Sequence, residues 1–293
     1  MKRLAIVLSI LAIQSPAWAQ YSEEGYPFKT EVKGAGKPII LIPGLSSSGD
    51  VWQQTVDLLQ ENFACHVLTL AGFAGQPPVD LTNGYLPVMK SAIETYIKNE
   101  LTARPVLIGH SLGGFLAMEI AATAPELAVK VVVVDAYPFM AAAYNPAATV
   151  AAVRPQALMM KELLLNEPDS AFASQQTATL PTMITPKDKI SLACQWSLAS
   201  DRPTIAEAMF ELMTTDLRNN IGNIRVPLLV LGSWYGGKDY GITKEMVTTS
   251  YINQFTKTKN CKIKIAATAK HFIMWDDFEW FYNEVDTFIR DGQ

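Results

Sequence analysis

The sequence predicts an α/β fold with a mostly parallel, doubly wound sheet, and two observations carry this prediction. Short apolar runs alternate with helical patterns along most of the chain, as in a parallel sheet covered by helices on both faces. The run 130–134 (KVVVV) is apolar on both sides, which is typical of a central parallel strand. The chain has 293 residues, of which 49% are hydrophobic and 18% charged, so one large core with an inserted segment is expected.

The expected strands are short apolar runs bounded by turn residues. They comprise residues 37–42, 65–70, 105–108, 130–134, 226–231 and 262–267. The expected core helices place apolar residues three or four positions apart. They comprise residues 50–62, 86–101, 112–124, 243–255 and 275–289. Because strands and helices alternate, each strand is expected to lie parallel to its neighbours.

Residues 136–222 interrupt this alternation and are expected to form a helical cap. They show no convincing strand pattern and are rich in Ala, Met and Pro. Helical patterns cover residues 155–165, 189–198 and 204–217. The core is therefore expected to consist of residues 20–135 and 223–293, with the cap inserted after the strand 130–134.

Residues 1–19 have the pattern of a secretory signal peptide. A positively charged start is followed by an apolar run over residues 4–13, and a small-x-small pattern (Ala17-Trp18-Ala19) ends the segment. The apolar run is too short to span a bilayer comfortably, and no later stretch approaches the roughly 20 apolar residues of a transmembrane helix. The mature protein is therefore expected to be exported, without a membrane span, to the periplasm or the extracellular space.

Charge and cysteine content narrow the expected partners. The formal net charge is −4, and removing Lys2 and Arg3 with the leader would make it −6. This balance argues against nucleic-acid binding, which needs a basic surface, so the expected partner is a small-molecule substrate. Cys65, Cys194 and Cys261 lack metal-type spacing; they are expected to be small buried hydrophobes, although export would permit one disulfide. No metal and no cofactor is implied, and the oligomeric state is not indicated.

The most informative motif is Gly109-His110-Ser111-Leu112-Gly113, which fits the pattern Gly-x-Ser-x-Gly. An apolar strand precedes it and an amphipathic helix follows it, as in a nucleophile elbow. Ser111 is therefore expected on a tight turn that lifts its hydroxyl above the sheet, with a helix N-terminus directed at it. A dinucleotide site is disfavoured, because no Gly-x-Gly-x-x-Gly follows the first strand.

These features resemble the α/β-hydrolase superfamily, in the branch that carries a cap after the sixth strand. The resemblance extends from about residue 37 to residue 289 and depends on the elbow, the Pro43-Gly44 turn, the order of the elements and a histidine near the C-terminus. It implies a serine nucleophile, an acid and a histidine in that chain order. It does not identify a substrate, because one fold hosts many functions.

Histidine is the usual base for a serine nucleophile, and the chain has three. His66 lies at the start of a strand upstream of the elbow. His110 adjoins Ser111, but its side chain is expected to leave the turn in another direction and to pack beneath the elbow. His271 follows the last expected strand, where the resemblance places the base, so it is the predicted general base.

The acid that orients His271 has two candidates. The resemblance places it in the loop after the strand 226–231, where Asp239 is the only carboxylate, although this loop is longer than the common Gly-x-x-Asp form. Asp135 directly follows the preceding strand 130–134, where some relatives have the acid. Asp239 is the preferred prediction and Asp135 is the alternative.

Two backbone N–H groups are expected to stabilise the oxyanion of the tetrahedral intermediate. One belongs to Leu112, after the nucleophile, and the other to Leu45, in the loop after the first core strand. Ser46 or Ser47 could add a hydroxyl donor, or the serines at positions 46–48 could cap the helix that begins at Asp50.

Apolar side chains of the cap are candidates to line a substrate pocket, or they could merely pack the cap onto the core. They are Phe139, Met140, Met159, Met160, Trp196, Met209, Phe210 and Met213. The expected function is an exported serine hydrolase that cleaves a carboxylic ester of a small to medium, partly apolar substrate through an acyl-enzyme. Thioesterase, lactonase, amidase and perhydrolase activities share this machinery, and a non-catalytic binding protein that keeps the fold is the remaining alternative.

Overall fold

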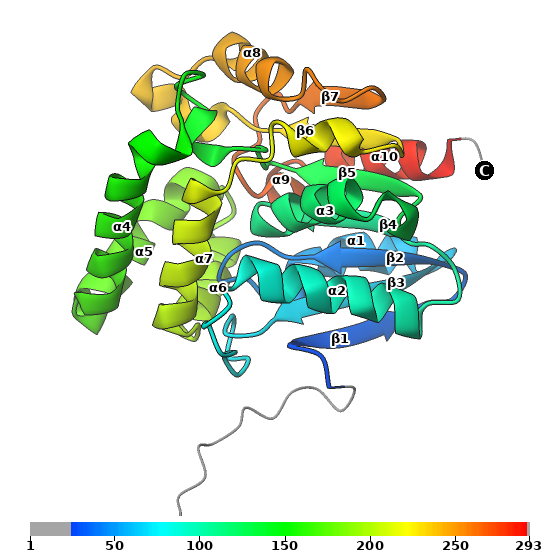
Figure 1. Ribbon diagram of the computed structural model, residues 1–293, viewed down its shortest axis with the longest axis horizontal. Helices are drawn as coiled ribbons and strands as arrows, with labels where there is room; N and C mark the ends of the chain where they lie inside the picture. The colour runs from blue at the N-terminus through cyan, green and yellow to red at the C-terminus, as the bar shows by residue number, and fades with distance from the viewer. Residues whose placement is uncertain (1–24, 292–293) are drawn as a thin grey trace, which may run out of the picture.

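The computed structural model describes residues 25–291 (Figure 1). Within this range the core is a seven-stranded sheet with the strand order β1-β3-β2-β4-β5-β6-β7. The strands are β1 (Phe28–Lys33), β2 (Lys37–Ile42), β3 (Phe63–Leu70), β4 (Val106–His110), β5 (Lys130–Val134), β6 (Leu228–Gly232) and β7 (Cys261–Ile265). The predicted signal peptide at residues 1–19 lies outside the described residues.

Only the edge strand β1 departs from the predicted parallel arrangement among the described strands. It pairs antiparallel with β3, and all other neighbours are parallel. The sequence FKTEVK has few apolar residues and, apart from Phe28, its side chains are partly or fully exposed, so an apolar run could not reveal it. The six predicted strands correspond to β2 through β7 with shifts of a few residues at their ends.

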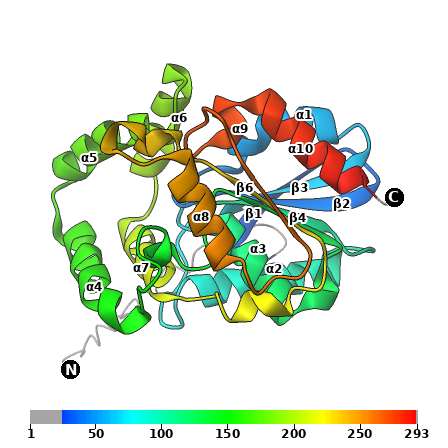
Figure 2. The same cartoon turned by 90° about the horizontal axis from the view of Figure 1, so that it is seen from above.

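Helices cover both faces of the sheet (Figure 2). α2 (Leu86–Glu100) and α3 (Leu112–Thr123) lie on one face, and their buried side chains join one core cluster with those of α8 (Lys244–Gln254). α1 (Gln53–Leu59), α9 (Ile273–Asp276) and α10 (Phe278–Arg290) contribute to the cluster on the opposite face. The predicted helix 50–62 is a 3-10 turn, η1 (Gly49–Trp52), followed by α1, and the predicted closing helix 275–289 is divided between α9 and α10.

The two central strands are buried on both faces, as their composition predicts. All five residues of β4 are buried, and so are the four valines of β5. The three cysteines are free thiols, and Cys65 is fully buried in β3, so none of them forms the disulfide that export would permit. Burial raises the pKa of the Cys65 thiol to about 11, which leaves it protonated and unreactive at neutral pH. No helix within residues 25–291 combines the length and the apolar character that crossing a membrane requires.

Residues 136–222 form a helical segment between β5 and β6. It contains a 3-10 turn, η3 (Met140–Ala142), and the helices α4 (Val150–Asn166), α5 (Asp169–Met183), α6 (Lys187–Leu198) and α7 (Arg202–Thr214). These helices are grouped beside one end of the sheet in Figure 1. The sequence patterns indicated α4, α6 and α7 but missed α5, which buries only Phe172 and Leu180 and so lacks an apolar stripe.

The position of the helical segment in the strand count differs from the prediction. It was expected after a sixth strand, but it follows β5, the fifth strand in chain order within residues 25–291. The reason is that a single described strand, β1, precedes β2. The segment contacts the loop after β3, where Asp201 N–H donates to the Gly72 carbonyl at 2.7 Å and Gly75 N–H donates to the Ala199 carbonyl at 3.1 Å.

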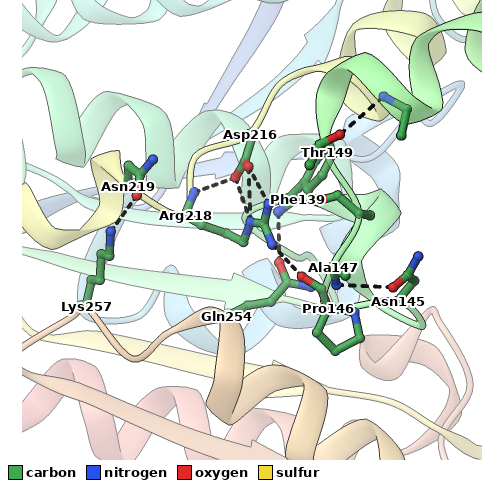
Figure 3. Close-up of polar contacts among 12 residues, drawn as sticks. Phe139, Asn145, Pro146, Ala147, Thr149, Asp216, Arg218, Asn219, Gln254 and Lys257 are labelled. Atoms are coloured by element: carbon green, nitrogen blue, oxygen red, sulfur yellow. Dashed lines mark hydrogen bonds and ion pairs between the residues drawn. The ribbon is translucent and has the colours of Figure 1, made fainter.

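Arg218 closes the base of the helical segment, where the chain returns to the core (Figure 3). Its guanidinium donates to the Asp216 carboxylate, at 2.6 Å for the shortest contact, and to the Pro146 and Ala148 carbonyls at 3.1 and 3.0 Å. It also lies 4.9 Å from the centroid of the buried Phe139 ring. One side chain therefore joins the start of the segment to its end.

We expect Arg218→Ala to lower the free energy of unfolding by about 1–3 kcal/mol, because it leaves two carbonyls without their donor and removes the guanidinium from the Asp216 carboxylate, which keeps only the backbone N–H of residue 218. The measurement is urea denaturation followed by circular dichroism. Arg225→Ala, at an exposed arginine of the following loop, is the control and should change the free energy of unfolding by less than about 0.5 kcal/mol. Equal effects of the two substitutions would contradict the role given to Arg218.

Candidate active site

The register of three parallel strands aligns the residues that follow them. His110 of β4 is paired with Val134 of β5, and Val134 is paired with Leu231 of β6. The pairing continues one residue further, because Ser111 N–H donates to the Val134 carbonyl at 2.9 Å and Asp135 N–H donates to the Leu231 carbonyl at 2.7 Å. Ser111 and Asp135 therefore lie on neighbouring strand ends at one edge of the sheet.

Ser111 occupies the strained turn that the elbow motif predicts. Its backbone has φ 52° and ψ −118°, a conformation that costs an L-residue about 1–3 kcal/mol and is found at functional sites. Close approach of strand and helix requires the flanking glycines: a Cβ on Gly109 would lie 2.1 Å from the Gly113 carbonyl oxygen, and one on Gly113 would lie 2.2 Å from the Ile42 carbonyl oxygen. The surroundings thus hold the serine in a geometry that its own preferences disfavour.

His271 is bonded to a carboxylate and packs beside the elbow. Its Nδ1 lies 2.7 Å from Oδ2 of Asp135, and its ring centroid lies 4.5 Å from that of His110, the residue before Ser111. Because Nδ1 is bound to the carboxylate, Nε2 is the nitrogen that remains for proton transfer. Within residues 25–291 Ser111 Oγ and His271 form no hydrogen bond; such bonds commonly tighten only when substrate is present.

The carboxylate on His271 belongs to Asp135, so the preferred prediction of Asp239 as its partner is wrong. Asp239 lies in a 3-10 helix, η5 (Tyr235–Tyr240), and its side chain is exposed. Tyr235, at the head of that helix, occupies the position where the common Gly-x-x-Asp form has its acid. The lengthened loop carries Asp239 further along η5, whereas Asp135 directly follows a strand that is in register with the elbow.

Asp135 accepts hydrogen bonds from three other groups. Ser233 donates through its N–H to Oδ1 and through its hydroxyl to Oδ2, both at 2.7 Å, and the Tyr251 hydroxyl donates to Oδ1 at 2.9 Å. The Asp135 backbone has φ 48°, so Asp135 is strained in the same way as Ser111. The sequence reasoning missed Ser233 and Tyr251, and the one signal for Ser233 is its position just after β6.

His110 packs beneath the elbow as predicted and links it to the His271 loop. Its ring is fully buried, and Nε2 donates to the His271 carbonyl at 3.1 Å. Burial, together with the neighbouring His271, lowers the pKa of His110 well below its ordinary value, so the ring is neutral. His66 lies away from the elbow in β3, where its Nδ1 is 2.7 Å from the Tyr96 hydroxyl.

Two backbone N–H groups are available for an oxyanion. Leu112 is the first residue of α3, and Leu45 lies in the loop after β2, next to Ser46, whose φ is 54°. Neither N–H donates to an acceptor in the described part of the chain. Ser48 caps η1 by accepting from Asp50 N–H at 3.1 Å, so for this serine the capping alternative holds.

The side chains expected to line a pocket are dispersed over the helical segment. Phe139 is fully buried beneath Arg218, and Trp196 packs against Trp275 with ring centroids 5.7 Å apart. These two rings therefore serve in packing, which is the alternative to a pocket-lining role that the sequence left open. Met159 faces solvent on α4 with 73% of its surface exposed, so a lining role for it is wrong in this arrangement. Met140 and Met209 are partly exposed, and their lining role stays a prediction.

Comparison with known families decides where the chain belongs. A family model described as the alpha/beta hydrolase family matches residues 39–284. The chain belongs to the α/β hydrolase family. The predicted superfamily and the mostly parallel α/β fold are therefore confirmed, and so is the prediction of a hydrolase. The predicted cap after a sixth strand is not confirmed.

Relatives of this α/β hydrolase include esterases. A pimeloyl-(acyl-carrier protein) methyl ester esterase of Vibrio parahaemolyticus serotype O3:K6 is 28% identical over 253 residues, which cover 84% of this chain and 92% of the relative. An esterase from Exiguobacterium antarcticum superposes with a TM-score of 0.75 at 15% identity, covering 92% of this chain and 97% of that one. The enol-lactonase from Burkholderia xenovorans LB400 superposes with a TM-score of 0.72 at 16% identity, covering 90% of this chain and 96% of that one. At these identities the two structures show a common fold.

The neutral, buried His110 predicts an acid-dependent loss of stability. The pKa of His110 is lower in the folded protein than in the unfolded chain. As pH falls below about 6.5, His110 therefore binds a proton in the unfolded state but not in the folded state. This contribution is present at neutral pH and is lost at up to about 1.4 kcal/mol per pH unit on acidification.

We expect His110→Asn to flatten the dependence of the free energy of unfolding on pH between pH 7 and 5, measured by urea denaturation at each pH. Ser111→Ala, which changes no titrating group, should keep the wild-type slope. A slope that His110→Asn leaves unchanged would show that His110 does not resist protonation.

Proposed function

We propose that this α/β hydrolase is a serine esterase that cleaves a carboxylic ester of a small to medium, partly apolar substrate. The observation that carries the proposal is the pairing of His271 with Asp135, 2.7 Å apart, beside a serine held in a strained elbow. An acid, a histidine and a serine in these roles define the machinery of acyl transfer. The esterases and the lactonase among the relatives support ester bonds as its target.

The acylation half of the reaction begins with Ser111. Its Oγ attacks the ester carbonyl carbon while His271 Nε2 takes the hydroxyl proton. The carbonyl oxygen becomes an oxyanion, which the N–H groups of Leu45 and Leu112 stabilise. The Asp135 carboxylate stabilises the positive imidazole that forms and keeps its ring oriented. When the tetrahedral intermediate collapses, the alcohol leaves with the proton from Nε2, and an acyl-enzyme remains on Ser111.

The deacylation half uses the same groups in the same order. His271 Nε2 removes a proton from a water molecule, whose oxygen attacks the acyl carbon. A second oxyanion forms and then collapses, which releases the carboxylic acid and returns the proton to Ser111 Oγ. The net reaction adds one water across the ester bond, and no metal or cofactor enters it.

The proposal includes export of the mature protein to the periplasm or the extracellular space. The charged start, the apolar run over residues 4–13 and the small-x-small pattern at residues 17–19 support it. The proposed substrate is a free ester of low molecular weight, so it differs from the carrier-bound ester in the name of the Vibrio relative.

We expect a fluorophosphonate probe to label the wild-type protein, because an activated serine attacks its phosphorus and displaces fluoride. Ser111→Ala should abolish labelling and should reduce ester hydrolysis to background. In-gel fluorescence and the release of p-nitrophenol from short-chain esters measure the two effects. Unlabelled wild-type protein, assayed beside a known serine esterase that does label, would contradict the proposed function.

The two carboxylates give a second expected outcome. Asp135→Asn should lower kcat about 10³- to 10⁴-fold, because the amide cannot stabilise the imidazolium or fix the correct tautomer of His271. Asp239→Asn, at an exposed site in η5, is the matched control and should stay within about twofold of wild type. Steady-state kinetics on one ester decide the matter, and the opposite ranking would remove Asp135 from the proposed machinery.

A further inference from the structure

We propose that Tyr251 is a positioning residue for the reaction, holding the Asp135 carboxylate in the orientation that His271 requires. This inference rests on the function proposed above. Tyr251 lies on α8, a helix outside the elbow and outside the loops that carry the proposed acid and base. No sequence motif marks it, and its assignment depends on where the fold places its hydroxyl.

The two oxygens of Asp135 have different partners. Oδ2 faces the imidazole at 2.7 Å, and Oδ1 accepts the Tyr251 hydroxyl at 2.9 Å. Ser233 bonds both oxygens, through its N–H to Oδ1 and through its hydroxyl to Oδ2. Rotation of the carboxylate about its Cβ–Cγ bond would break these contacts together, so each donor on Oδ1 also fixes Oδ2 against His271.

Asp135 needs such support from outside its own chain segment. Its backbone is in a conformation with φ 48° that L-residues rarely adopt, and the chain leaves it at once for the helical segment of residues 136–222. Ser233 follows the neighbouring strand β6, and Tyr251 comes from α8. Two elements besides β5, which Asp135 follows, therefore determine where its carboxylate points.

The phenol of Tyr251 is a permanent donor. Its side chain is fully buried, and burial, followed by the charge of Asp135, raises the pKa of Tyr251 well above its ordinary value. The hydroxyl consequently keeps its proton at neutral pH. Of the two partners it is the phenol that donates and the carboxylate that accepts.

Packing holds the ring in place. Tyr137 stacks on Tyr251 with centroids 4.1 Å apart and an interplanar angle of 18°. Gly232 makes room for the ring, because a Cβ at that position would lie 2.4 Å from Cε2 of Tyr251. The helix itself is tied to the chain after Asp135, since the Ser250 hydroxyl donates to the Ala143 carbonyl at 2.6 Å. The donor is thus preorganised before any substrate arrives.

The test is Tyr251→Phe, which removes a single oxygen atom. We expect kcat to fall about tenfold, as for the loss of a hydrogen bond to a charged group, while KM changes by less than about twofold because no substrate contact is lost. The rate is expressed per active site titrated with a fluorophosphonate, so that misfolded protein does not enter it. Tyr85→Phe is the matched control: Tyr85 is fully buried, and its hydroxyl donates to the Ala71 carbonyl at 2.9 Å.

A spectroscopic signature distinguishes positioning from a general loss of packing. In wild-type protein the Nδ1 proton of His271, bound to Asp135, is expected far downfield of the amide region in proton NMR. Tyr251→Phe should shift or broaden this resonance, and Tyr85→Phe should leave it unchanged. Gly232→Ala keeps the Tyr251 hydroxyl, and its Cβ would collide with the Tyr251 ring and with Cδ1 of Ile265. It should act in the same direction as Tyr251→Phe and provides a second variant.

Two results would overturn the inference. One is a titrated Tyr251→Phe enzyme with the kcat of Tyr85→Phe, and the other is an Nδ1 proton resonance that neither Tyr251→Phe nor Gly232→Ala alters. Failure of the proposed function would give a different result, namely wild-type protein that neither reacts with the fluorophosphonate nor hydrolyses esters. In that case the NMR comparison still reports whether Tyr251 holds Asp135.

Discussion

The hydrogen bond between Asp135 and His271 is the contact on which the proposed chemistry depends, and the sheet register makes it possible. β4, β5 and β6 end opposite one another, so the elbow, the acid and the Ser233 donor follow three adjacent strand ends. His271 reaches them from the loop after β7. Parallel strands that end together give an open edge at which loops of distant sequence meet. The site therefore depends on hydrogen bonds between backbones that take no part in the reaction.

Backbone strain where β4 and β5 end falls on Ser111 and Asp135, whose side chains the proposed reaction needs. Within residues 25–291 the non-glycine residues with positive φ are Ser46, Ala74, Ser111 and Asp135. Two of them are the proposed nucleophile and acid, and Ser46 follows the proposed oxyanion donor. Glycine would relieve the backbone at Ser111 and at Asp135, but it would remove the side chain that the proposed reaction needs. Neighbouring strands and helices supply the stabilisation that keeps these turns in place.

The helical segment begins immediately after the acid, which couples its anchoring to the site. Arg218, paired with Asp216 at the end of the segment, donates to the backbone near its beginning (Figure 3). α8 holds the same stretch through Ser250 and Gln254. These contacts fix the chain that follows Asp135, while β5 fixes the chain that precedes it. A carboxylate at the boundary between core and insertion is thus held from both directions.

The sequence by itself determined the fold class, the core helices, the strands β2 to β7 and the elbow at Ser111, since apolar periodicity and a glycine-flanked serine are local signals. It also determined His271 as the candidate base, because the chain offers few histidines. Only the tertiary structure decided between Asp135 and Asp239, which differ in the register and length of their loops and not in residue type. Ser233 and Tyr251 were likewise invisible, because a hydroxyl acquires its role from the carboxylate that folding brings within 3 Å of it. Short sequence patterns therefore indicate which residues can react. Which carboxylate and hydroxyls contact His271 and Asp135 depends on contacts between distant strands and helices, which no short pattern indicates.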